Sequence, residues 1–132
     1  MSELAEKIRN KLTVDESIII EHVLDRLSKL IGITKTGKVI FKISREALTT
    51  KNQIALYAIG KYMAKQAGYI ESDQISIEEL TRELGISPKI ASTRAGELRR
   101  EESSSVSREE CIRINPILIE SIISEIEGRS SR

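Results

Sequence analysis

Several residue types are scarce in this sequence, and each shortage excludes a kind of site. Cys111 is the only cysteine and His22 the only histidine among 132 residues, so the chain offers neither an internal disulfide nor a Cys/His set for zinc. The three tyrosines, Tyr57, Tyr62 and Tyr69, are spaced as core or helix-end residues and not as a platform on which single-stranded bases stack. A lone thiol is typical of a reducing, intracellular environment.

Long apolar runs and catalytic motifs are also missing. No run approaches the ~20 residues that a membrane-spanning helix needs, and the N-terminal MSELAEKIRN is charged where a signal peptide is apolar. The segment TKTGK at residues 34–38 lacks the spacing of a phosphate-binding loop and the Ser or Thr after its lysine. We therefore expect a cytoplasmic protein that is not an enzyme, contacts no membrane and holds no metal, cofactor or small-molecule ligand.

Charge is abundant but unevenly distributed. The chain has 21 basic and 20 acidic side chains, which gives a formal net charge of +1. Residues 1–70 hold 12 basic and 7 acidic side chains, whereas residues 71–132 hold 9 and 13. Frequent isoleucine together with abundant Lys, Arg and Glu is typical of thermophile proteins. The acidic surplus after residue 70 argues against a nucleic-acid-binding role for that part, because such domains usually carry a basic face.

The first 49 residues predict two helices followed by extended structure. Residues 3–12 carry an apolar residue at every fourth position, as an amphipathic helix does. A capping box begun by Thr13 opens a second helix over residues 13–31, which Gly32 ends. Residues 33–43 alternate around a turn and read as strands. The apolar stripe of helix 13–31 fits two alternatives, packing on its own domain or a dimer interface.

From Thr50 onward the sequence predicts short helices separated by turn signals. Thr50 caps a helix that is apolar around most of its circumference and runs to Gly68, which predicts a central position. Ser76 and Ser87 cap the next two helices. The remaining predicted elements are strands near Ile75, at 103–106 and at 111–114, and a last helix opened by Asn115-Pro116 and closed by Gly128.

The turn at residues 85–87 carries the most informative motif. Its glycine permits a reversal, its isoleucine fits between the two helices, and its serine caps the second helix, so the helices are expected to meet at a steep angle. Together with the two-stranded ribbon at 103–114 and the closing helix, this motif makes residues 50–127 resemble the winged helix-turn-helix family. The family's apolar pattern, one residue in the turn and three on the second helix, falls on Ile86, Ala91, Ala95 and Leu98.

The resemblance implies a mainly α fold with a small α+β wing. Residues 1–49 are then an N-terminal helical and extended segment, residues 50–127 the winged helix-turn-helix domain, and residues 128–132 a disordered tail. The chain departs from the family at Ala91 and Ala95, where larger aliphatic residues are usual, and at Gly96 inside the second helix. A glycine there costs about 1 kcal/mol relative to alanine.

The resemblance also implies a DNA-binding surface. The second helix of the motif enters the major groove, and its N-terminal half meets base edges. Arg94 suits a bidentate contact to guanine, Arg99 and Arg100 suit phosphates, and Arg108 takes the place of a wing arginine. Between residues 87 and 100 there are four basic side chains and one acidic one. The residues expected at DNA are Ser87, Lys89, Ile90, Ser92, Thr93, Arg94, Arg99, Arg100 and Arg108.

Two functions from different classes fit these patterns. The first is sequence-specific binding of double-stranded DNA by a transcriptional regulator of archaeal type, acting as a homodimer through the helices at 13–31 and 116–127. The alternative is a protein-interaction module in a larger assembly, because winged-helix folds also serve as scaffolds. The acidic surplus of residues 71–132 favours the alternative, whereas the local basic surplus of residues 87–100 favours DNA.

Overall fold

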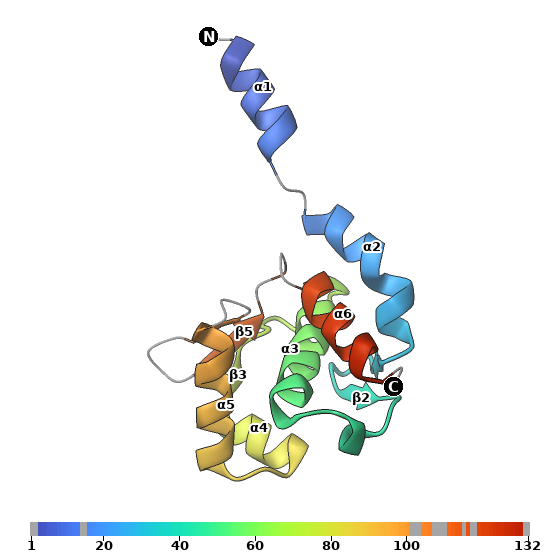
Figure 1. The fold of residues 1–132 in the computed structure, drawn as a ribbon, viewed down its shortest axis with the longest axis vertical. Helices are drawn as coiled ribbons and strands as arrows, with labels where there is room; N and C mark the ends of the chain where they lie inside the picture. The colour runs from blue at the N-terminus through green and yellow to red at the C-terminus, as the bar shows by residue number, and fades with distance from the viewer. Residues whose placement is uncertain are drawn as a thin grey trace.

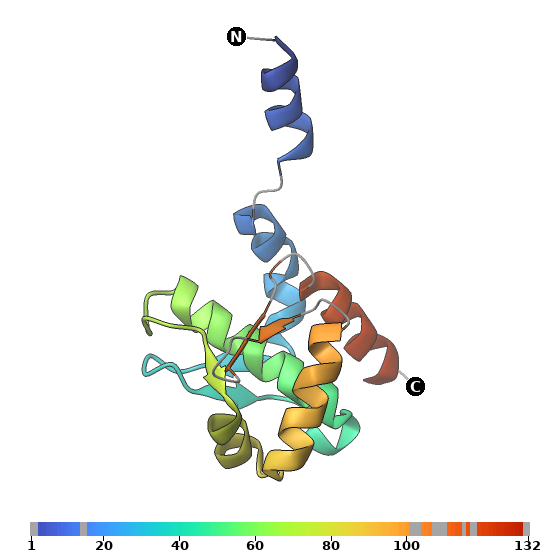
Figure 2. The same cartoon turned by 90° about the vertical axis from the view of Figure 1, so that its left-hand side faces the viewer.

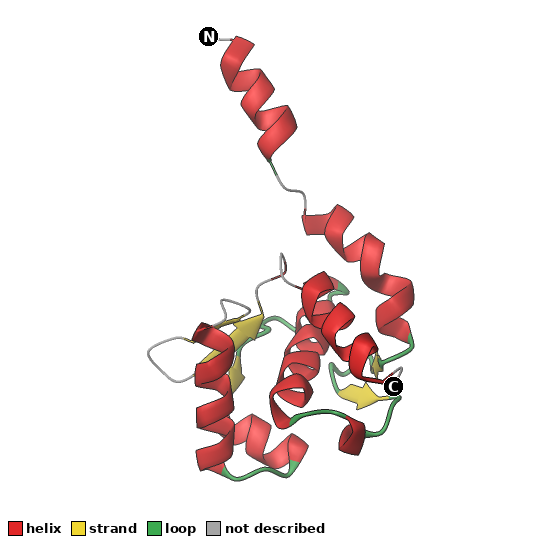
Figure 3. Cartoon of the chain, in the orientation of Figure 1, coloured by secondary structure: helices red, strands yellow, loops and turns green. Residues whose placement is uncertain are grey.

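The computed structural model describes residues 3–13, 16–100, 104–106, 111–114, 116 and 119–130. Within them the fold is mainly helical, with two small antiparallel sheets (Figure 1, Figure 3). The elements are, in chain order, α1 (Glu3–Leu12), α2 (Glu16–Ser28), β1 (Ile31–Ile33), β2 (Val39–Phe41), a 3-10 helix η1 (Arg45–Ala47), α3 (Thr50–Gln66), β3 (Ile75–Ser76), α4 (Ile77–Leu84), α5 (Pro88–Arg100), β4 (Ser104–Val106), β5 (Cys111–Ile114) and α6 (Ile119–Ser130).

Helix α3 lies at the centre of the fold, as its apolar circumference predicts (Figure 1). Ile54, Leu56 and Ile59 point to different sides of this helix, and all three are fully buried. The predicted cap at Thr50 is wrong by one residue. Thr49 has the extended backbone of a cap, and its side chain accepts a hydrogen bond from the Asn52 backbone N–H at 3.1 Å.

The β1–β2 hairpin packs directly against the backbone of α3. Its strands are antiparallel, with Ile31 opposite Phe41 and Ile33 opposite Val39. At Gly60 of α3 a Cβ atom would lie 2.7 Å from the Cγ2 atom of Val39, which is closer than real side chains approach. A side chain at position 60 would therefore push the hairpin away from the central helix.

Helix α2 ends earlier than the sequence predicts. The predicted stop at Gly32 is wrong, because α2 ends at Ser28 and Gly32 belongs to β1. The backbone carbonyl of Leu30 accepts a hydrogen bond from the Lys42 N–H at 2.8 Å, which ties this segment to the hairpin. The buried apolar residues continue from α2 into β1 without interruption, so the hydrophobic pattern does not mark the change from helix to strand.

Helices α2 and α6 pack on each other and on the core around α3 (Figure 1). Val23 and Leu27 of α2 are buried, and so are the four isoleucines predicted to line one face of the last helix. In the stripe of helix 13–31, Leu27 packs within its own domain, whereas Leu24 is 46% exposed, so a dimer interface on this helix stays a prediction. The buried isoleucines of α6 are Ile119, Ile122, Ile123 and Ile126.

Helix α6 extends beyond its predicted end. It continues through Gly128 to Ser130, so the predicted stop at Gly128 and a disordered tail beginning there are wrong. A Cβ at Gly128 would meet nothing within 4 Å, and a glycine inside an exposed helical turn is tolerated at a modest cost. The helix begins at Ile119, and the predicted opening at Asn115 lies outside the described residues.

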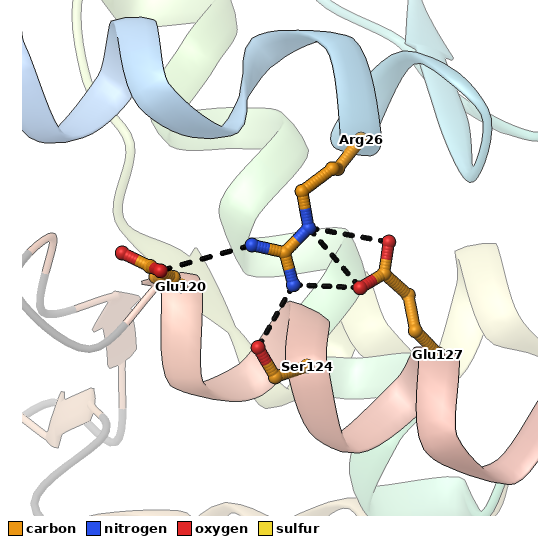
Figure 4. Close-up of polar contacts among 4 residues, drawn as sticks. All are labelled: Arg26, Glu120, Ser124 and Glu127. Atoms are coloured by element: carbon orange, nitrogen blue, oxygen red, sulfur yellow. Dashed lines mark hydrogen bonds and ion pairs between the residues drawn. The ribbon is translucent and has the colours of Figure 1, made fainter.

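One arginine of α2 holds the α2–α6 pair together at the surface (Figure 4). The Nη2 group of Arg26 donates to Glu127 Oε1 at 2.6 Å and to Ser124 Oγ at 2.8 Å, and its Nη1 atom lies 3.8 Å from Glu120 Oε1. The hydrogen bond from Arg26 is the largest influence on Glu127 and lowers the pKa of that carboxyl. The ionised carboxylate is thus favoured in the folded protein.

This ion pair predicts a pH dependence of stability in the acid range. Because the folded pKa of Glu127 lies below its unfolded value, the pair stabilises the fold above the unfolded pKa, and the stabilisation is lost as pH falls through the folded pKa. We expect Arg26→Gln to lower the melting temperature at neutral pH and to lose part of the acid-range decline. Thermal melts over a pH series measure this, with Lys35→Gln as a control for the loss of an exposed cation. If the melting temperature of Arg26→Gln fell with decreasing pH as steeply as that of the wild type, the prediction would be contradicted.

Helix α1 stands apart from the rest of the described chain. It spans Glu3–Leu12, as the sequence predicts, and none of its residues is buried. Figures 1 and 2 show it leading away from the body beyond the start of α2. Residues 1–49 therefore divide into a protruding helix and a part, formed by α2 and the hairpin, that belongs to the common core.

Candidate nucleic-acid interface

Helices α4 and α5 are joined by a three-residue turn whose local chemistry fixes each end. Ser76 caps α4 by accepting from the Glu79 N–H at 3.0 Å. Gly85 ends α4 in the left-handed conformation at φ 68°, which favours glycine. Ser87 then caps α5 by accepting from the Ile90 N–H at 3.2 Å, and Ile86 packs partly buried against the core. The predicted roles of these three turn residues are confirmed.

The inner side of α5 packs against α3, α4 and β4. Ala91 and Ala95 are buried, as their spacing predicts. Small side chains at these positions allow the backbone of α5 to approach its neighbours closely. Gly96 has a different position, because a Cβ there would meet nothing within 4 Å and no close packing requires a glycine.

The outer side of α5 faces solvent over the N-terminal half of the helix. The side chains of Lys89 and Thr93 lie opposite the buried alanines, and Ile90 is 45% exposed although it is a large apolar residue. The surface therefore combines a cation, hydroxyl groups and one aliphatic side chain. The predicted positions that are exposed here are Ser87, Lys89, Ile90, Ser92, Thr93 and Arg94.

Arg94 lies at the edge of this surface and has a partner that the sequence analysis missed. Its Nη1 group donates to Glu97 Oε1 at 2.6 Å, one turn along the same helix. The two side chains line a pocket of 290 Å³ together with Glu125 and the start of α3 at Thr49 and Thr50. Acidic and basic residues three positions apart on a helix are neighbours, so the spacing was the available signal.

For the other predicted arginines the structure gives at most the position of the backbone. Arg99 and Arg100 lie in the last turn of α5, the helix that contacts β4. Arg108 lies outside the described residues, between β4 and β5. These strands pair antiparallel, with Ser104 opposite Ile114, and β3 joins the other edge of β5. The strand predicted near Ile75 is thus confirmed, and the sheet order is β3-β5-β4.

A polar network beside the turn of the β1–β2 hairpin, also missed by the sequence analysis, fixes α4 to α3. The Tyr57 hydroxyl donates to Glu79 Oε2 at 2.5 Å, and the Lys61 Nζ atom lies 3.1 Å from the same oxygen. Burial first, and then the carboxylate partner, raise the pKa of Tyr57, so its phenol remains a proton donor. The side chains involved satisfy one another, and this network holds the first helix of the turn motif in place.

Two features are absent from the described part of the chain, a cluster of metal-ligating side chains and a membrane-spanning helix. Over those residues, no group of three or more His, Cys, Asp or Glu side chains is close enough to hold a metal ion. None of the described helices combines the length and apolarity needed to cross a membrane. No protein-family model, curated protein or solved structure matches the chain.

Proposed function

We propose that this chain is a winged helix-turn-helix protein that binds double-stranded DNA sequence-specifically through α5, as a transcriptional regulator of archaeal type. The observation that carries the proposal is the solvent-facing outer side of α5 on a helix whose inner side is fixed by buried Ala91 and Ala95. A helix held in this way can enter the major groove, which is about 12 Å wide, without unfolding or moving the core.

The order of elements supports this proposal. Helix α3, strand β3, helices α4 and α5 with their three-residue turn, and the β4–β5 ribbon follow one another as the resemblance to the family implies. Figure 1 shows α5 at one side of the molecule, with α4 at its N-terminal end and the sheet beside it. A duplex lying along this side would meet α5 first and the ribbon next.

The residues of α5 divide between base and phosphate contacts under this proposal. Lys89 and Thr93 are on the outermost side of α5 and are expected to contact base edges in the major groove. Arg94, at the edge of the same side, is expected to contact a guanine. Ser87 lies at a helix N-terminus, where unpaired backbone N–H groups favour a phosphate. Arg99, Arg100 and Arg108 remain the expected phosphate and wing contacts.

A protein-interaction module in a larger assembly is the second candidate. It is favoured by the exposed Ile90 and by the Arg94–Glu97 pair, which make the outer side of α5 partly apolar and mixed in charge. The acidic surplus of residues 71–132 points the same way. A protein surface tolerates such a mixture, whereas a phosphate backbone is repelled by each uncompensated carboxylate.

Selection of genomic fragments by the purified full chain tests the two candidates. DNA binding predicts enrichment of a common motif, with two-fold symmetry if the protein acts as a homodimer. It also predicts a dissociation constant that rises with salt along a straight line on logarithmic axes. Absence of binding to any fragment even at low salt would reject the DNA proposal and leave the protein-interaction module.

The Arg94–Glu97 pair makes a further prediction for DNA affinity. Glu97→Gln removes a carboxylate that would lie near the DNA phosphates and breaks the 2.6 Å ion pair with Arg94. The affinity for DNA is therefore expected to rise between about twofold and tenfold. Fluorescence anisotropy with a labelled duplex measures the change. Glu71→Gln, an exposed carboxylate on the loop after α3, is the matched control and is expected to change nothing. Weaker binding by Glu97→Gln would contradict this role for the pair.

A further inference from the structure

Helix α1 carries an apolar stripe that the described part of the chain leaves exposed. Leu4, Ile8 and Leu12 lie on one face of this ten-residue helix, and they are 65%, 47% and 71% exposed. An isolated helix shorter than roughly 12–15 residues is only marginally stable in water. A surface that covers this stripe would therefore stabilise the helix as well as bury its apolar side chains.

An apolar groove on the body of the protein has the matching chemistry. It has a volume of 160 Å³ and lies between α2, β1 and α3. Leu24 on its rim is 46% exposed, whereas Leu27 beside it is buried. Apart from the Ser28 and Gly32 positions, the groove is lined by Leu24, Leu27, Ile31, Ile33 and Met63.

The charges on the α1 stripe and on the Leu24 side of the groove are complementary. On α1, Lys7 and Lys11 lie along one side of the stripe and Arg9 along the other, while both glutamates of the helix lie on the opposite face. On α2, Glu21 and Asp25 are exposed and lie next to Leu24 on the solvent side. The stripe is thus bordered by cations, and the Leu24 side of the groove by carboxylates. On the Ser28 and Gly32 side the groove has a cation of its own, because Lys42 Nζ donates to the Ser28 carbonyl at 3.0 Å.

In this structure α1 does not lie on the groove of its own chain. Leu24, Leu27 and Ser28 are at the C-terminal end of α2, whereas α1 joins the N-terminal end and leads away from it (Figure 1, Figure 2). Helix α2 has 13 residues and is about 20 Å long, and α1 extends beyond the end of α2 that is opposite to Leu27 and Ser28 (Figure 1).

We propose that two copies of this chain form a dimer by exchanging α1, so that each stripe fills the other copy's groove. A reciprocal exchange of this kind is two-fold symmetric, because each copy gives and receives the same helix. It buries Leu4, Ile8, Leu12 and Leu24 of both copies and pairs the cations of α1 with Glu21 and Asp25. The inference is independent of DNA binding, since none of these residues lies on α5.

Solution mass of the full chain, by sedimentation equilibrium over a concentration series, tests the exchange. The wild type is expected to be a dimer, and Ile8→Glu is expected to raise the dimer dissociation constant at least about tenfold. Asn10→Glu adds the same charge on the opposite face of α1 and is expected to leave the mass unchanged. Circular dichroism melts check that both variants keep the folded core, which Ile8 does not contact when exposed.

Charge reversal distinguishes exchange from other arrangements. Lys7→Glu with Lys11→Glu, and separately Glu21→Lys with Asp25→Lys, are each expected to give monomers, because like charges then border both surfaces. A mixture of the two variants is expected to restore a dimer containing one copy of each. A monomeric wild type would overturn the proposal, as would a dimer that survives Glu21→Lys with Asp25→Lys, since the helices would then pair without the groove.

Discussion

Lys89→Glu combined with Arg94→Glu is expected to weaken binding to double-stranded DNA by about a hundredfold or more at physiological salt. Both side chains are exposed on α5, and the change places two carboxylates where two cations stood. The slope of log affinity against log salt concentration is expected to become shallower by about two, because two fewer counterions are released from the DNA. The variant also loses the Arg94–Glu97 ion pair and places a carboxylate near Glu97 and Glu125, so we expect a modest fall in melting temperature, because exposed ion pairs contribute about 1 kcal/mol or less.

Lys35→Glu with Lys38→Glu provides a matched control for this experiment. It reverses the same amount of charge on the exposed turn of the β1–β2 hairpin, which Figures 1 and 2 show on a different side of α3 from α5. We expect it to weaken binding far less, because it acts only through the overall charge. Equal losses from the two double variants would show that α5 has no special part in binding.

Gly60→Leu is expected to lower the free energy of unfolding by roughly 3 kcal/mol or more, the upper range for overpacked cores. A Cβ at this position would lie 2.7 Å and 2.8 Å from the two γ carbons of Val39 and 3.2 Å from the Ile31 Cδ1 atom. Both neighbours are buried in the hairpin, so β1 and β2 would have to move off α3. Urea unfolding followed by circular dichroism gives the change.

The same substitution at Gly96 separates packing from helix propensity. Gly96 is also inside a helix, but a Cβ there meets nothing within 4 Å, so Gly96→Leu is expected to stabilise the protein by about 0.5–1 kcal/mol. Changes of opposite sign in the free energy of unfolding of the two variants would confirm that the hairpin packs on α3 only because residue 60 has no side chain. Equal effects would mean that the hairpin is not packed as described.

Much of the fold around the turn motif is predictable because its signals are local. Ser76 and Ser87 each satisfy a backbone N–H at the start of a helix, and Gly85 supplies the left-handed residue that ends one. Such signals depend on neighbours within three or four residues. The exposure of Lys89 and Thr93 follows equally directly from the buried spacing of the alanines on the same helix.

The parts that escaped prediction are those decided by distant contacts. The end of α2 depends on pairing between β1 and β2, and α6, which packs beside α2, continues past the local stop signal at Gly128. The spacing of Arg94 and Glu97 predicts that the two side chains pair, but it does not predict that the pair lies beside the start of α3. The Tyr57–Glu79 contact joins residues 22 positions apart, and no local pattern marks it.

The most direct test of the central claim is an NMR titration of the full, isotope-labelled chain with a duplex recovered by selection. We expect the backbone amide signals of residues 87–94 to shift or broaden most, and those of the β1–β2 hairpin to change little. Unchanged signals of α5 in a complex with the duplex, or no binding of any duplex at any salt concentration, would contradict DNA binding through α5.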